Sequence, residues 1–164
     1  MEYFDVLNKN REHLNYTKLR GTTLKDHEYN QSAEIWIINN NKVLLTQRSK
    51  EKSHPLMWEI PGGMTLANET TDVTIIRELK EETNINLDNT DIKLIDTHIY
   101  KNQFIDIYLS YKNIDVNNIK LQKEEVSDFK FVSKDEFLEM INNNEIVPAV
   151  ITRFNMIKEK INID

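Results

Sequence analysis

The sequence contains no cysteine, and it has only three glycines and three prolines among 164 residues. The absence of cysteine excludes disulfide bonds, zinc–thiolate sites and thiol nucleophiles. Long apolar runs are missing as well: the first residues include acids, and no segment approaches the roughly 20 apolar residues that cross a bilayer. We therefore expect a cytoplasmic protein with no membrane partner.

Positive charge is also scarce, because 21 Lys and Arg face 27 Asp and Glu, which leaves a net charge of −6. Binding to a nucleic-acid duplex needs a basic surface, so such a partner is not expected. An acidic protein can still bind phosphates locally, through divalent cations and a few arginines. The length and the 39% hydrophobic content predict one globular domain over residues 1–164, with an N-terminal hairpin over about 1–30 and a core over about 31–160.

Segments rich in Val, Ile, Leu and aromatic residues predict the strands. A short hairpin is expected to begin with residues 3–7, and a second hairpin is expected to turn across Asn39–Asn41. The strands predicted after the first hairpin cover residues 33–38, 42–48, 92–98, 104–111 and 129–132. Since helices alternate with these strands, the pattern predicts an α/β fold with a mixed sheet.

Three helices are predicted between these strands. The first covers residues 69–83, where Val73, Ile76 and Leu79 recur every three residues and are expected to pack on the core. The second covers residues 135–141, after Ser133 as N-cap with a glutamate three residues later. The third begins near Pro148 and runs to about residue 161.

Three glutamates of the first predicted helix share one face. At about 100° per residue, Glu78, Glu81 and Glu82 fall within a wedge of roughly 100°. Like charges at this spacing repel each other, and a hard divalent cation such as Mg²⁺ or Mn²⁺ is the natural compensation because it takes carboxylate oxygens as ligands. The six residues from Arg77 to Glu82 alone are also typical of a solvated helix face.

The longer register favours the metal site. Gly63 is followed after five residues by Glu69, and after seven more by Arg77-Glu78-Leu79-Lys80-Glu81-Glu82. This resembles the Nudix box, G-x5-E-x7-R-E-U-x-E-E-x-G-U, in which U is a bulky aliphatic residue. Asn84 replaces the last glycine of the pattern. That glycine ends the helix in a left-handed conformation, which asparagine adopts more readily than other non-glycine residues.

The resemblance implies an α/β/α sandwich with a mixed sheet, and a loop and helix that bind Mg²⁺ or Mn²⁺ against a diphosphate. It implies as metal ligands Glu78, Glu81, Glu82 and the carbonyl of Gly63. Glu69 would have a supporting role, and Arg77 would hold neighbouring carboxylates through paired hydrogen bonds.

The general base and the phosphate contacts are less closely defined by the resemblance. In the family the base is either a box glutamate or a carboxylate on a later loop, for which Glu124 and Glu125 are the candidates here. Arg48 and Arg20 could contact the substrate phosphates. Trp36 could belong to the core or stack on a nucleobase, whereas His54 lies in a predicted loop and is given no role.

The expected function is a Mg²⁺-dependent hydrolase that cleaves a diphosphate linkage in a nucleoside diphosphate derivative or a related small molecule. Homodimers are frequent in the family. The layout also resembles the subgroup of isopentenyl-diphosphate isomerase, but that enzyme uses a cysteine that this sequence lacks. A module that senses a nucleotide without cleaving it is the third possibility, although such modules typically lose box glutamates.

Overall fold

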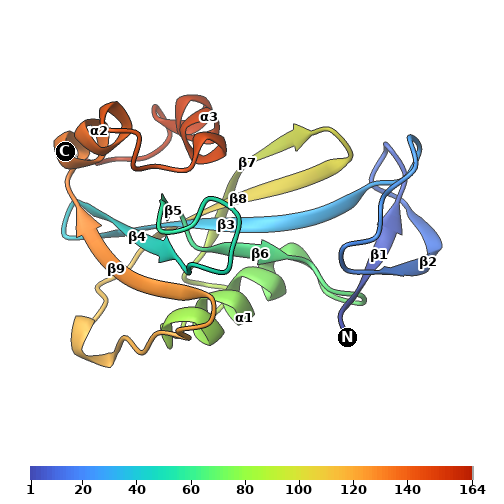
Figure 1. Cartoon of the computed structure of the whole chain (residues 1–164), viewed down its shortest axis with the longest axis horizontal. Coiled ribbons are helices and arrows are strands. Elements are labelled where there is room, and N and C mark those ends of the chain that lie inside the picture. Colours follow the sequence, from blue (N-terminus) through green and yellow to red (C-terminus); the bar gives the residue numbers. More distant parts are fainter. Residues whose placement is uncertain (164) are drawn as a thin grey trace.

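The computed structural model describes residues 1–163, which form two sheets and three helices (Figure 1). The strands are β1 (Tyr3–Leu7), β2 (His13–Leu19), β3 (Asn30–Asn39), β4 (Lys42–Arg48), β5 (Trp58–Glu59), β6 (Gly62–Met64), β7 (Lys93–Tyr100), β8 (Gln103–Tyr111) and β9 (Val126–Val132). The helices are α1 (Thr71–Thr83), α2 (Lys134–Asn142) and α3 (Pro148–Ile157), and Val116–Asn118 form a short 3-10 turn. The predicted strands and helices are all present, with α3 ending earlier and β9 beginning earlier than expected.

Strand β3 is the centre of the larger sheet, whose order is β5-β4-β3-β8-β7. It runs parallel to β8 and antiparallel to β4 and β6, so the sheet is mixed as predicted. Strands β3 and β4 pair only near their turn. Farther from the turn, β3 pairs with β6, and β4 pairs with β5 and β9. Because β3 and β4 diverge, β5, β6 and the loops beside them reach the same region of the molecule.

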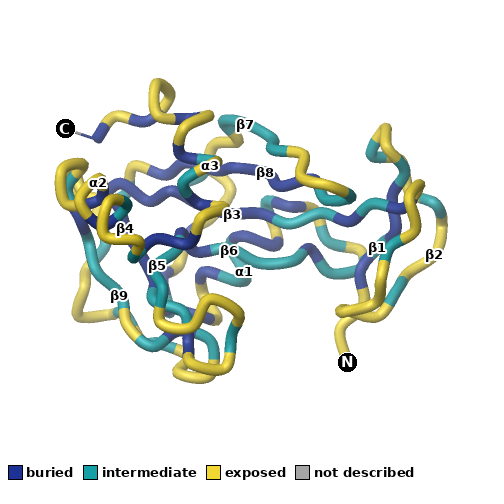
Figure 2. Tube along the Cα trace, turned by 45° about the horizontal axis from the view of Figure 1, so that its top comes forward, coloured by how far each residue is buried: buried dark blue, intermediate teal, exposed yellow. Residues whose placement is uncertain are grey.

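Alternate residues of β3 supply the two cores, one on each face of the sheet. Ile35 and Ile37 pack with α1, whereas Trp36 and Ile38 pack beneath α2 and α3. Helices therefore cover both faces (Figure 1), and β3 and β8 are buried along most of their length (Figure 2). This is the expected α/β/α sandwich.

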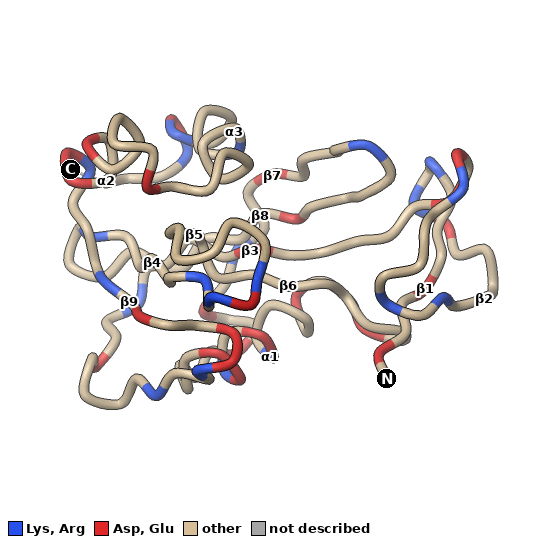
Figure 3. The backbone as a smooth tube through the Cα atoms, viewed as in Figure 1, with Lys and Arg blue, Asp and Glu red and all other residues tan. Residues whose placement is uncertain are grey.

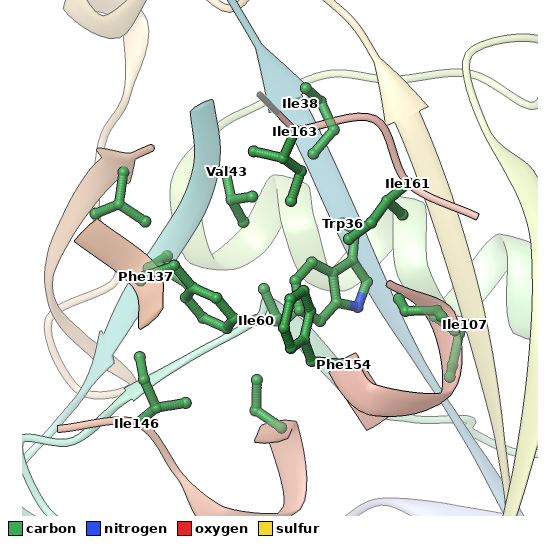
Figure 4. Close-up of a cluster of buried hydrophobic side chains, with 14 of the residues drawn as sticks. Trp36, Ile38, Val43, Ile60, Ile107, Phe137, Ile146, Phe154, Ile161 and Ile163 are labelled. Carbon is green, nitrogen blue, oxygen red and sulfur yellow. The ribbon is translucent and has the colours of Figure 1, made fainter. Parts of the chain in front are cut away.

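Trp36 belongs to the core on the side of α2 and α3. Its side chain is fully buried, and its ring stacks on Phe154 at 5.8 Å between centroids, with Phe137 edge-on to both (Figure 4). The indole Nε1 donates a hydrogen bond to Glu34 Oε1 at 3.1 Å. Of the two roles considered for Trp36, the structure supports the core role and leaves no face free for a nucleobase.

Helix α1 is rotated relative to the packing face predicted for it. The prediction that Val73 packs on the core is wrong: its side chain is 46% exposed, while Ile75 and Leu79 are fully buried. The buried residues recur at spacings of three and four along α1, and the last two are Thr83 and Glu82, of which Glu82 is 5% exposed. The core side of the helix thus includes an acidic residue. The sequence had predicted one apolar face and a separate acidic face.

The caps at the helix ends agree with the predictions. Asn84 follows α1 with φ 61°, in the left-handed region, and its N–H donates to the carbonyl of Lys80 at 2.9 Å. Ser133 and Glu136 form a reciprocal capping box at the start of α2.

In the part of the chain that is described, no helix has the length and apolar character that crossing a bilayer requires.

Candidate metal and phosphate site on helix α1

Gly63 on β6 lies directly against α1. A Cβ atom added to Gly63 would lie 2.2 Å from Cδ of Glu78, so only glycine leaves room for that carboxylate. Gly62 has the same constraint from β3, because its Cβ would lie 2.5 Å from the carbonyl oxygen of Ala33. Close approach of neighbouring chain, rather than an unusual backbone conformation, therefore explains the two consecutive glycines.

Arg77 connects three carboxylates of the site. Its Nε and Nη2 donate to the two oxygens of Glu69 at 2.7 and 3.0 Å, and its Nη1 donates to Glu78 at 3.0 Å and Glu81 at 3.2 Å. Glu69 accepts two further hydrogen bonds, from the Leu66 N–H and a threonine hydroxyl. Burial tends to raise the pKa of Glu69, but these hydrogen bonds outweigh it, so that its pKa is lowered.

A second cation, Lys52, lies among the other acidic side chains. Its Nζ is 3.0 Å from Glu125 Oε2, 3.6 Å from Glu82 Oε1 and 3.8 Å from Glu59 Oε1. Burial opposes the charge on Lys52, but the three carboxylates outweigh it and raise its pKa. Figure 3 shows the acidic residues of α1 and of the segment before β9, with the mixed charges of the β4–β5 loop.

Glu82 is the most perturbed of the glutamates on α1. Burial raises its pKa to about 8, the negative charges of Glu78, Glu59 and Glu125 add to the shift, and Lys52 opposes it. Burial also raises the pKa of Glu78, although Arg77 counteracts this. Burial is thus the main cause of both shifts, and it favours the neutral carboxyl at Glu82 unless a cation binds there.

The donor chemistry of this cluster fits a hard divalent cation. Glu78, Glu81 and Glu82 come from successive turns of one helix, and the space over Gly63 lets Glu78 lie against the backbone. In the described residues, no three acidic or histidine side chains converge as metal ligands. Arg77 contacts Glu78 and Glu81, and Lys52 lies near Glu82. A metal would replace part of these contacts.

The remaining predicted site residues occupy different positions. Arg48 forms an ion pair with Glu59 and donates to the backbone at Ser53, beside the cluster. Arg20 pairs with Glu2 at 2.6 Å, with a side chain that is 53% exposed. Its pKa is raised first by the hydrogen bond to Glu2, and the charges of Glu78 and Glu125 add to the shift.

The two candidates for a base on the later loop are separated by the fold. Glu125 contacts Lys52 and is partly buried, whereas Glu124 is exposed and makes no ion pair with the described residues. Sequence reasoning missed Lys52 and Glu59. Lys52 follows Lys50 and Glu51 in a polar loop, so its sequence context resembles that of an exposed residue. Only the fold shows that its side chain turns inward.

A pocket of about 410 Å³, here called the α3–β7 pocket, lies between the start of α3, the end of β7 and the β4–β5 loop. Its lining includes His54, His98, Tyr100 and Arg153. Arg153 Nε donates to the buried carboxylate of Glu34 at 2.6 Å. Burial raises the pKa of Glu34, and the charge of Glu59 adds to the shift. The β4–β5 loop connects the pocket to the acidic cluster, because it carries both His54 of the pocket lining and Lys52.

Comparisons with known proteins agree with this geometry. The family described as NUDIX domain matches residues 28–153. The uncharacterized Nudix hydrolase lmo0368 of Listeria monocytogenes is 32% identical over 151 residues, which span 90% of this chain and 89% of the relative.

Solved structures share the fold at lower identity. DR0079 from Deinococcus radiodurans superposes with a TM-score of 0.73 at 18% identity, over 89% of this chain and 92% of its own. A bifunctional NMN adenylyltransferase/ADP ribose pyrophosphatase from Francisella tularensis, complexed with AMP and a manganese ion, has a TM-score of 0.62 at 23% identity. That superposition covers 80% of this chain and 42% of the Francisella protein.

Proposed function

The chain belongs to the Nudix hydrolase family, and from this membership we propose that it is a Mg²⁺- or Mn²⁺-dependent pyrophosphohydrolase that cleaves the diphosphate linkage of a nucleoside diphosphate derivative. The Francisella neighbour, an ADP ribose pyrophosphatase with bound AMP and manganese, supports this class of substrate and metal.

The concentration of carboxylates around α1 is the observation that carries the proposal. Glu78, Glu81, Glu82 and the carbonyl of Gly63 would hold the metal. A bound divalent cation neutralises phosphate charge and activates water for attack on phosphorus. The raised pKa values of Glu78 and Glu82 support this assignment, because burial disfavours their bare negative charge and a bound cation would compensate it.

Arg77 and Glu69 position the ligands. The paired hydrogen bonds from Arg77 to Glu69 orient the guanidinium, whose Nη1 then reaches Glu78 and Glu81. An arginine held on two nitrogens loses little further freedom when it binds a third group. These residues would hold the carboxylates of Glu78 and Glu81 in place beside Gly63.

Glu125 accepts the proton of the attacking water in this proposal. Its carboxylate is closer to the α1 cluster than that of Glu124, and Lys52 holds it at 3.0 Å. When a metal takes Glu82, the ammonium of Lys52 becomes available to a substrate phosphate. Arg48 would stabilise the β4–β5 loop through its ion pair with Glu59. Arg20 would add positive charge that acts on Glu78 and Glu125.

A panel of diphosphates tests the function. Nucleoside triphosphates, ADP-ribose, nucleotide sugars and isopentenyl diphosphate are incubated with Mg²⁺, Mn²⁺ or EDTA, and the products are identified by chromatography. We expect cleavage between the two phosphorus atoms of at least one nucleoside diphosphate derivative, only in the presence of metal. Cleavage that persists in EDTA, or isomerisation of isopentenyl diphosphate without cleavage of any substrate, would contradict the proposal.

A further inference from the structure

We propose that the α3–β7 pocket binds the nucleobase of the substrate and that Arg153 selects bases with two adjacent hydrogen-bond acceptors, namely guanine or cytosine. This deepens the proposed function and rests on it, since the pocket would hold the organic group attached to the diphosphate. The pocket has the size and wall chemistry of a small-molecule site, with a volume of about 410 Å³ and more apolar than polar lining.

Aromatic side chains form one wall of the pocket. Tyr100 and His98 lie on the same side of β7 with nearly parallel rings, 6.3 Å apart at an interplanar angle of 19°. Tyr100 is 56% exposed although it is aromatic, and Lys101 covers it at 5.3 Å from the ring centroid. An exposed aromatic ring beside a pocket favours stacking with a planar ligand.

Arg153 supplies the polar recognition at the same place. Its side chain is 13% exposed, and Nε is bound to Glu34, itself nearly fully buried. Among the described residues, neither terminal guanidinium nitrogen donates a hydrogen bond to a protein group. The ion pair thus fixes the plane of the guanidinium and leaves two parallel donors for a ligand that reaches the pocket.

Two parallel donors match two adjacent acceptors. Arginine binds O6 and N7 of guanine in this manner, and cytosine offers N3 and O2 as a similar pair. Adenine places its amino donor beside N1 and N7 and has no second acceptor beside N3, and uracil places its N3–H between its two carbonyls. Neither base therefore satisfies both terminal nitrogens of Arg153. The absence of an acidic residue from the pocket lining agrees with a ligand that accepts hydrogen bonds rather than donating them.

The position of the pocket suits a nucleoside attached to the diphosphate at α1. Arg153 shares the pocket lining with His54, and His54 lies two residues after Lys52 in the same β4–β5 loop. Lys52 in turn borders the α1 glutamates. A substrate can therefore place its base beside Arg153 and its phosphates beside Lys52 along one continuous set of neighbours.

Binding of nucleoside monophosphates to the metal-free protein tests the inference without depending on catalysis. Calorimetric titration with GMP, CMP, AMP and UMP in EDTA should show that GMP or CMP binds at least about tenfold more tightly than AMP and UMP. In Arg153→Lys, which keeps a cation for Glu34 but loses the fork, this ratio should fall to near one. Comparison of GMP with CMP then identifies which acceptor pair is read.

Two further variants separate recognition from folding. Arg11→Lys makes the same change at an arginine paired with Asp106, outside the pocket, and should keep the native selectivity. Tyr100→Ala alters an exposed side chain and should weaken all four ligands while leaving their ratio unchanged.

Equal binding of the four monophosphates, or an equal loss for all of them in Arg153→Lys, would overturn the inference. Selective binding in a protein that cleaves no diphosphate would support the inference and refute the proposed function. Cleavage of diphosphates without any selectivity among bases would support the proposed function and refute the inference.

Discussion

At the scale of single residues, Glu82 combines burial with a place among the proposed metal ligands. Burial raises its pKa from 4.5 to about 8, so between these values the folded protein holds a proton that the unfolded chain releases. The stability of the metal-free protein should therefore fall as pH rises from about 4.5 to about 8. The contribution of Glu82 to this slope is at most about 1.4 kcal/mol per pH unit.

Denaturant unfolding in EDTA at several pH values measures this slope. In Glu82→Gln, which cannot lose a proton, stability should decline less over the same range than in the native protein. Contributions from carboxylates with lowered pKa, such as Glu69, act in both proteins and cancel in the comparison. Parallel slopes for the two proteins would show that Glu82 is ionised in the folded state.

Gly63 provides a second prediction at this scale. Because a Cβ there would collide with the carboxylate of Glu78, Gly63→Ala should displace that ligand and lower kcat/KM at least about tenfold, as misplacement of catalytic groups does. Gly21→Ala is the matched control: its Cβ meets nothing within 4 Å, although φ is +90°. The control should lose about 1 kcal/mol of stability but keep its activity. Equal activity in both variants would argue against a role for Gly63.

At the scale of elements, the end of α1 depends on the left-handed conformation of Asn84. Asn84→Ala should lower the free energy of unfolding by about 1 to 2 kcal/mol, because alanine adopts this conformation less readily. Asn84→Gly should have a free energy of unfolding closer to that of the native protein than Asn84→Ala has. Both variants lose the side-chain hydrogen bond to the carbonyl of Asn118, so they differ only in how readily they adopt the left-handed conformation. Thermal or denaturant unfolding gives the order. An alanine variant as stable as the glycine variant would show that the cap does not limit stability.

The same helix shows how far prediction from sequence reaches. Its existence, its extent and its cap followed from local signals: periodicity, a spaced motif and a residue suited to the left-handed region. Its rotation did not, because Val73 was assigned to the core and Glu82 to an exposed acidic face. The buried Glu82 lies 3.6 Å from Lys52, which comes from a loop distant in the sequence that no local pattern connects to α1.

At the scale of the whole molecule, the alternation of strands and helices was enough to predict an α/β fold with a mixed sheet. The spaced glutamates were enough to predict the family, and the resemblance to that family implied the sandwich. The pocket and the cluster around Lys52 were beyond reach. Both depend on segments that are distant in the sequence: the β4–β5 loop, the segment before β9 and the start of α3. These segments meet because β3 and β4 diverge after their turn. Arg153 and Glu34 are 119 positions apart, and no local pattern pairs them.

The most direct test of metal-dependent cleavage at α1 is the rate of product formation as a function of Mg²⁺ in the native protein, Glu82→Gln and Glu139→Gln. Glutamine resembles the protonated carboxyl that burial favours, so Glu82→Gln should fold, yet it lacks the charge that binds metal. Its rate should fall at least about 100-fold, while Glu139→Gln, on the exposed side of α2, should match the native protein. An unchanged Mg²⁺-dependent rate in folded Glu82→Gln would contradict the account.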